Sequence, residues 1–151
     1  QLYFLLRRIE QSAKVNNTKN LLISDFYFGK DELFAKINLN DEEYAMYLEI
    51  RDKLHFNPPT PDLIIYLQAS TDILLDRIKK RGLDIEKGMK KKYIDTVNHI
   101  YMKHFHEYNT SPVLIINTSN VNINNETDYK MLIEEISSNI NGKKYFNPSS
   151  L

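Results

Sequence analysis

The segment from Pro61 to Glu86, PDLIIYLQASTDILLDRIKKRGLDIE, constrains the fold more than any other part of the chain. Residues 62–69 form an apolar run that is too short for a helix and rich in Ile and Leu, so we expect a strand with both faces buried. Ser70 or Thr71 can cap a helix that follows and that ends at Gly82. Because a strand buried on both faces lies inside a sheet, this segment predicts a central strand followed by a helix.

The other elements alternate in the same way. Buried strands are expected over residues 21–25 and 111–118. Amphipathic patterns and capping residues predict helices over residues 1–15, 31–38, 41–56, 84–108 and 127–140. This alternation predicts an α/β fold with a parallel sheet flanked by helices. Three strands are few for such a sheet, so we expect further strands upstream or from a partner.

The C-terminal end differs from the rest in its pattern. Gly142 stops the last predicted helix, and the segment KKYFNPSSL that follows predicts a frayed tail. We therefore expect one α/β domain over residues 1–142 and a C-terminal tail over residues 143–151.

Composition excludes several classes of function. Twenty basic and twenty acidic residues give zero formal net charge, which argues against broad nucleic-acid binding. Without cysteine the chain has neither disulfides nor a thiolate zinc site, and no apolar run is long enough to span a membrane. We expect a cytoplasmic protein that contacts neither nucleic acid nor membrane.

A few charged residues are candidates for a functional site. Arg77 and Arg81 are spaced i, i+4 near the end of a predicted helix and could close over an anion. Asp25 ends a predicted strand, and ligands gather at the carboxyl ends of parallel strands, although a turn cap is an equal alternative. Read alone, Arg8 is a solvated helix charge, and Glu86 is an acid that complements a helix N-terminus.

These motifs resemble the deoxynucleoside kinase family, nearer its bacterial deoxyadenosine and deoxyguanosine kinase branch. The resemblance covers nearly the whole chain and rests on LLISDF with LFAKINL, PDLIIYL, DRIKKRG with Glu86, Tyr93, HFHEY and PVLIIN. It implies a P-loop NTPase-like fold. The family's N-terminal strand, GxxxxGK[ST] phosphate loop and catalytic carboxylate precede the segment that resembles residues 1–15, and the motif does not occur here. We therefore expect missing upstream sequence, and no activity from this piece alone.

The resemblance implies roles for residues that contact the acceptor. Gln1 is similar to the glutamine that pairs with the nucleobase edge, and Arg8 matches a position that helps to select the base. Glu86 resembles the lid glutamate that accepts a hydrogen bond from the sugar 3′-hydroxyl. Tyr93 could pack beside that site, although tyrosine at an apolar helix position is usually a core residue.

It also implies roles in phosphate chemistry. Asp25 resembles the strand-terminal acid that holds magnesium, and Arg77 and Arg81 resemble lid arginines that contact the donor phosphates. Two family arginines are missing. Leu83 replaces the third lid arginine, and Phe26 stands where many members carry an arginine after the acid. Either Lys30 or Arg8 substitutes for the latter, or this branch arranges the charge differently.

The resemblance thus implies ATP- and Mg²⁺-dependent phosphorylation of the 5′-hydroxyl of a deoxynucleoside, preferably a purine one, in nucleotide salvage. Family members are commonly dimers, with the first and the long helix near the interface, so a homodimer is expected. Two alternatives stay open at this point. One is a nucleoside monophosphate kinase similar to thymidylate kinase, and the other is a noncatalytic remnant that binds a partner through its sheet edge.

Overall fold

The computed structural model describes residues 1–15, 21–25, 27–86, 88–119 and 121–147. The chain divides into two compact units, Gln1–Thr60 and Pro61–Leu151, and each unit is described by itself.

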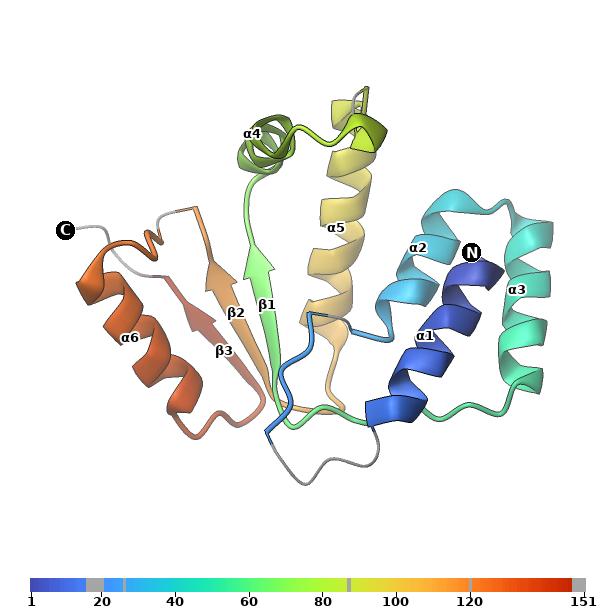
Figure 1. The fold of residues 1–151 in the computed structure, drawn as a ribbon, viewed down its shortest axis with the longest axis horizontal. Helices are drawn as coiled ribbons and strands as arrows, with labels where there is room; N and C mark the ends of the chain where they lie inside the picture. Colours follow the sequence, from blue (N-terminus) through green and yellow to red (C-terminus); the bar gives the residue numbers. More distant parts are fainter. Residues whose placement is uncertain (16–20, 26, 87, 120, 148–151) are drawn as a thin grey trace. The chain divides into compact units, whose positions relative to one another are not determined.

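The first unit is helical in its described part. It contains helices α1 (Leu2–Val15), α2 (Lys30–Asn38) and α3 (Asp41–Lys53), which Figure 1 draws in blue to green. Helix α3 begins with a capping box, because Asn40 Oδ1 accepts from the Glu43 amide at 2.9 Å and Glu43 Oε2 accepts from the Asn40 amide at 3.0 Å. One side chain from each helix forms the core, and these are Leu5, Ala35 and Tyr47.

The prediction of a strand over residues 21–25 was wrong. These residues have no regular secondary structure, and Leu21, Leu22 and Ile23 are exposed. A strand needs a neighbour that satisfies its backbone N–H and C=O groups, and the described part of the first unit contains no strand to pair with.

The second unit is an α/β structure built on a parallel sheet. Its strands are β1 (Ile64–Gln68), β2 (Val113–Asn117) and β3 (Lys143–Phe146), in the order β1-β2-β3. The helices of this unit are α4 (Thr71–Arg81), a 3₁₀ turn over Asp84–Glu86, α5 (Lys91–Glu107) and α6 (Glu126–Ser137).

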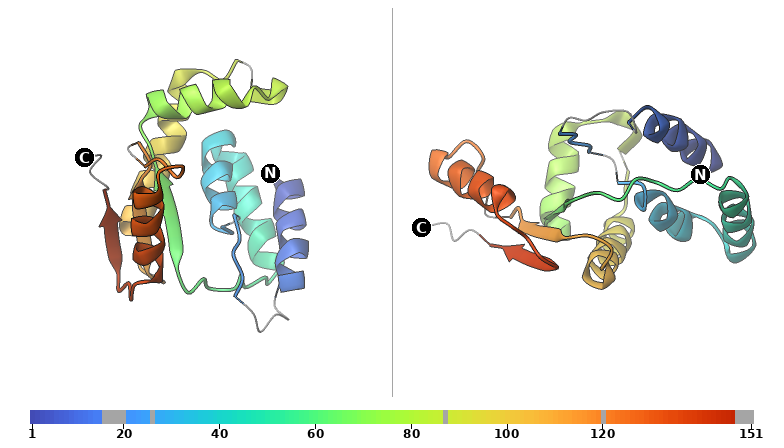
Figure 2. Two further views of the ribbon diagram at one scale, coloured as in Figure 1. Left: turned by 60° about the vertical axis from the view of Figure 1, so that its left-hand side comes forward. Right: turned by 90° about the horizontal axis from the view of Figure 1, so that it is seen from below.

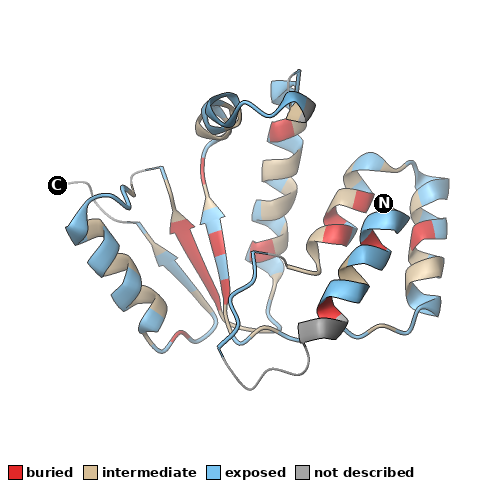
Figure 3. Cartoon of the chain, in the orientation of Figure 1, coloured by how far each residue is buried: buried red, intermediate tan, exposed pale blue. Residues whose placement is uncertain are grey.

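Helices α5 and α6 cover opposite faces of the sheet, as the views in Figure 2 show. Phe105 of α5 stacks on Tyr66 of β1 with ring centroids 4.7 Å apart. On the other face, Leu132 and Ile136 of α6 pack against the buried cluster that contains Leu114 and Ile116. Strand β2 is therefore buried on both faces along most of its length (Figure 3), as the sequence predicted for this segment.

Two predictions about the sheet need correction. Residues 143–146 are not part of a frayed tail, because they form β3 and pair with β2. Strand β1 is not central but lies at an edge of the described sheet, and its Ile65 and Leu67 side chains are exposed. An apolar run gives the number of apolar side chains but not the neighbours that cover them, so β1 and β2 look alike in sequence.

The helix boundaries in this unit follow from local chemistry. Ser70 Oγ accepts from the Ile73 amide, and Gly82 ends α4 in the left-handed conformation with φ of 68°. The long helix starts at Lys91 and not at Asp84, because Gly88 has φ of 95° and a helix cannot pass through that conformation. None of the helices in the described ranges has the length and apolar character needed to cross a membrane.

Candidate active site

Arg77 lies at the carboxyl ends of two strands. Its Nη1 donates to Thr118 Oγ1 at 2.8 Å, and its Nη2 donates to the Thr118 carbonyl oxygen at 2.8 Å. The Thr118 hydroxyl in turn donates to the carbonyl oxygen of Gln68, the last residue of β1, at 2.9 Å. Arg77 therefore places a positive charge where parallel sheets bind their ligands.

Arg81 and Glu86 form a bidentate ion pair. Arg81 Nε donates to Glu86 Oε2 at 3.1 Å, and Arg81 Nη2 donates to Oε1. Gly82 and the 3₁₀ turn fold the chain back and bring the two side chains together, with Glu86 only 14% exposed. The two bonds occupy two of the five N–H donors of a guanidinium, so Arg81 keeps donors for an anion. Tyr93, in the first turn of α5, is half-buried.

The first unit contains a buried charge pair that sequence reasoning missed. Arg8 Nη1 donates to Asp31 Oδ1, and the Tyr47 hydroxyl donates to Asp31 Oδ2 at 2.7 Å. Asp31 is 1% exposed and Arg8 is 18% exposed. One signal was available in the sequence, since Asp31 precedes the buried Ala35 by four residues and so lies on the core face of its helix.

Gln1 borders a surface hollow in the same unit. The hollow has a volume of about 310 Å³ and is lined by residues of α1 and α3 and their flanks, namely Gln1, Leu2, Tyr3, Leu39, Glu43, Met46 and Tyr47. This volume is near the lower limit of small-molecule sites. Tyr47 therefore lines the same hollow as Gln1, the predicted base-binding residue. It also donates a hydrogen bond to the Asp31 carboxylate.

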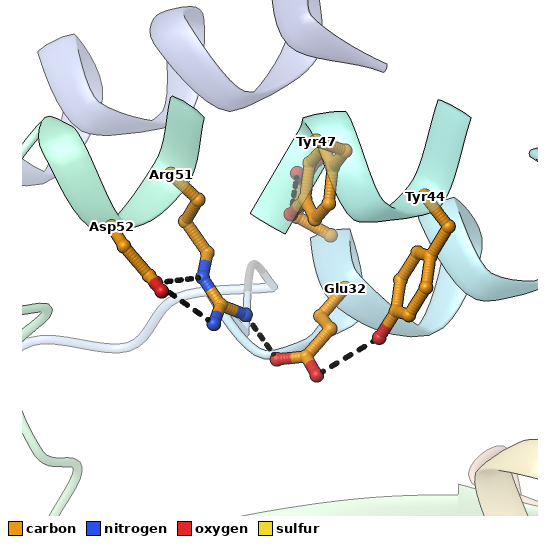
Figure 4. A network of polar contacts seen from close by, with 6 residues as sticks. Glu32, Tyr44, Tyr47, Arg51 and Asp52 are labelled. Atoms are coloured by element: carbon orange, nitrogen blue, oxygen red, sulfur yellow. Dashed lines mark hydrogen bonds and ion pairs between the residues drawn. The ribbon is translucent and has the colours of Figure 1, made fainter. Parts of the chain in front are cut away.

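A second polar network fixes α2 to α3 nearby (Figure 4). Arg51 Nη1 donates to Glu32 Oε2 at 2.6 Å, and the Tyr44 hydroxyl donates to Glu32 Oε1 at 3.3 Å. Burial and the neighbouring Glu32 carboxylate raise the pKa of Tyr44 above its usual value. Burial and the hydrogen bond to Asp31 raise the pKa of Tyr47 further, so its hydroxyl keeps the proton that it donates.

Asp25 and Lys30 take part in none of the side-chain contacts described above. Asp25 is exposed and follows an irregular segment, not the predicted strand. Lys30 is the first residue of α2, and its Nζ lies 5.7 Å from the centre of the Phe34 ring. No set of three His, Cys, Asp or Glu side chains in the described ranges could hold a metal ion. Mg²⁺ is commonly held by one or two carboxylates together with phosphates and water, and a single Asp25 fits that mode.

Comparison with known proteins decides the family. The sequence model of the family described as deoxynucleoside kinase matches residues 1–141. The chain belongs to the deoxynucleoside kinase family. Deoxynucleoside kinases are phosphotransferases that act on nucleosides, and the α/β architecture of this member agrees with that fold.

Curated and structural relatives of this deoxynucleoside kinase agree. It is 30% identical to a deoxyadenosine kinase of Lactobacillus acidophilus over 149 residues, which cover 89% of this chain and 69% of the relative. It is 24% identical to a deoxyadenosine/deoxycytidine kinase of Bacillus subtilis over 147 residues, covering 91% and 68% of the two chains. Its fold is similar to the structure of deoxyadenosine kinase from M. mycoides with bound dATP, with a TM-score of 0.77, 24% identity and coverage of 91% and 72%.

Proposed function

We propose that this deoxynucleoside kinase transfers the γ-phosphoryl group of ATP to the 5′-hydroxyl of a purine deoxynucleoside in nucleotide salvage. The observation that carries the proposal is the family match over residues 1–141. The purine preference is supported by the deoxyadenosine kinase of Lactobacillus acidophilus, and the use of a nucleoside triphosphate by the dATP bound to the M. mycoides enzyme. The same match favours a nucleoside over a nucleoside monophosphate as the acceptor.

The second unit carries the residues assigned to the donor and to the sugar. Arg77 and Arg81 contact the donor phosphates and neutralise charge that develops on the transferred group. Glu86 accepts a hydrogen bond from the sugar 3′-hydroxyl, and Tyr93 packs beside it. Because Glu86 is paired with Arg81, a sugar hydroxyl has to share or replace that contact.

The first unit carries the residues assigned to the base and to the metal. Gln1 pairs with the base edge and Arg8 selects the base. Since Arg8 is engaged by Asp31, we assign to Lys30 the role of the missing family arginine, which steadies the reacting 5′-oxygen. Asp25 holds Mg²⁺ together with phosphate oxygens, and the ion supplies charge neutralisation of the phosphates.

The test uses the protein expressed from its complete reading frame. Reading that frame 5′ of the Gln1 codon also checks the prediction that a GxxxxGK[ST] loop is encoded there. Transfer of labelled phosphate from ATP is measured with deoxyadenosine, deoxyguanosine, deoxycytidine, thymidine and their 5′-monophosphates. Faster phosphorylation of the purine deoxynucleosides is expected. Transfer to monophosphates only, or no transfer, would contradict the proposal.

Glu86→Ala tests the sugar contact within the same assay. Loss of a charge-assisted hydrogen bond is expected to lower kcat/KM for deoxyadenosine at least about tenfold. Asp84→Ala, two residues earlier in the same 3₁₀ turn, is the matched control and should stay near wild type. Equal activity of Glu86→Ala and wild type would remove this assignment.

A homodimer is part of the proposal. Helix α1 exposes the apolar side chains of Tyr3, Phe4 and Leu6, at 66%, 55% and 49% of their surface, and contact with a second copy would cover them. Sedimentation velocity at micromolar concentration distinguishes a dimer from a monomer.

A further inference from the structure

Helices α1, α2 and α3, which make up the described helical part of the first unit, meet at one buried carboxylate. Arg8 comes from α1, Asp31 from α2 and Tyr47 from α3, and the two Asp31 oxygens each accept from a different donor. Asp31 is 1% exposed and Tyr47 is 2% exposed. A buried carboxylate needs such donors, because an unpaired buried charge is strongly unfavourable.

We infer that Tyr47 is a positioning residue for base selection, because its hydroxyl fixes the Asp31 carboxylate and Asp31 fixes the Arg8 guanidinium. This inference rests on the proposed function, in which Arg8 selects the base. Tyr47 does not have to touch the base for this role. It acts through the orientation of the carboxylate plane, which determines the direction in which a planar guanidinium presents its remaining donors.

The chemistry of the tyrosine suits this role. Its hydroxyl stays protonated in the neutral pH range, because burial and the Asp31 hydrogen bond raise its pKa. It therefore donates to Asp31 and leaves the carboxylate as an acceptor for Arg8. Because the Tyr47 hydroxyl is a neutral donor, the Asp31 carboxylate keeps its full negative charge for the interaction with Arg8.

The location of Tyr47 connects this arrangement to the substrate. Tyr47 is one of the residues that line the hollow together with Gln1, and it packs in the core with Leu5 and Ala35. Tyr47 therefore belongs to two groups of residues. It lines the hollow together with the predicted base-binding Gln1, and its hydroxyl binds the Asp31 carboxylate that pairs with Arg8. A base substituent that enters the hollow would therefore lie next to Tyr47, the residue whose hydroxyl holds Asp31.

If Tyr47 had only a structural role, its substitution would not change base selection. Tyr44 provides the matched control. Tyr44 lies three residues earlier on α3, stacks on Tyr47 with ring centroids 6.2 Å apart and donates a hydrogen bond to Glu32. Tyr47→Phe and Tyr44→Phe each remove one hydroxyl and keep the ring. Only the first removes a donor to the carboxylate that holds Arg8.

The experiment measures kcat and KM of each variant for deoxyadenosine, deoxyguanosine and deoxycytidine, together with the KM for ATP. Tyr47→Phe is expected to raise the acceptor KM and to change the ratio of kcat/KM between deoxyadenosine and deoxycytidine by about tenfold. The KM for ATP should not move, and Tyr44→Phe should keep the wild-type ratio. In an Arg8→Met background, Tyr47→Phe should have no further effect on the ratio, because its effect passes through Arg8.

Two results would overturn the inference alone. One is a Tyr47→Phe protein with the same ratio as Tyr44→Phe, and the other is an undiminished effect of Tyr47→Phe in the Arg8→Met background. If Tyr47→Phe does not fold, Asp31→Asn replaces it, and an unchanged ratio in that variant counts against the inference. A wild-type protein that phosphorylates no deoxynucleoside overturns the proposed function and this inference together.

Discussion

Two neighbouring acids on α2 allow a direct test of how burial determines the stability given by an ion pair. Asp31 and Glu32 each pair with an arginine, but Asp31 is 1% exposed whereas Glu32 is 50% exposed. Breaking a buried pair costs about 3–5 kcal/mol, and we expect the lower end for Asp31→Asn because Arg8 retains 18% exposure. Glu32→Gln is expected to cost at most about 1 kcal/mol. Each variant removes one charge and keeps the side-chain volume.

Thermal unfolding followed by circular dichroism measures the difference. For a chain of 151 residues, about 2–4 °C of Tm per kcal/mol gives a decrease of roughly 6–12 °C for Asp31→Asn and at most about 4 °C for Glu32→Gln. Raising the salt concentration from about 0.05 to about 0.5 M should reduce the effect of Glu32→Gln and not that of Asp31→Asn. Equal decreases in Tm for the two variants would refute the reasoning, since burial would then not decide the energy.

Two further predictions concern the second unit. Thr118→Val removes the hydroxyl, one of the two acceptors of Arg77, so the KM for ATP should rise by about three- to tenfold. The control Thr118→Ser keeps the hydroxyl and should stay near wild type. An unchanged KM in Thr118→Val would show that Arg77 does not need this contact. Burial raises the pKa of Tyr66 from 10.0 to about 12. The unfolded state therefore releases this proton first, and the stability that is present below pH 10 should fall by about 2–3 kcal/mol as the pH rises through 12. Denaturant unfolding of wild type and Tyr66→Phe across this pH range measures the fall, and an identical pH dependence of the two proteins would contradict it.

Local sequence was sufficient for features that depend on neighbouring residues. The start of α3 and both ends of α4 follow from Asn40, Ser70 and Gly82, because capping and left-handed backbone conformations are decided within one helical turn. The end of α3 does not, since the helix stops at Lys53 and not at the predicted Phe56. The buried strand β2 follows from its apolar run. The spacing of Arg77 and Arg81 predicted that both lie near the end of one helix, which α4 confirms, and the family match supports the kinase reaction.

Pairing between distant segments was not accessible in the same way. Residues 21–25 were predicted as a strand and have no regular structure, whereas residues 143–146 were predicted as a tail and form β3. Strand formation depends on a neighbouring strand that accepts and donates the backbone hydrogen bonds, and not on apolar content alone. The bond from Arg81 to Glu86 depends on the turn that Gly82 begins, so spacing alone did not predict it.

The sequence by itself determined the family, the α/β class and most helix ends, since these depend on motifs and on interactions within a few residues. The tertiary structure alone decided the partners of the buried charges. Arg8 and Asp31 are 23 residues apart, and Tyr47 follows Asp31 by 16 residues. No local rule connects these positions, because the packing of three helices first has to remove the carboxylate from water before its two donors become necessary.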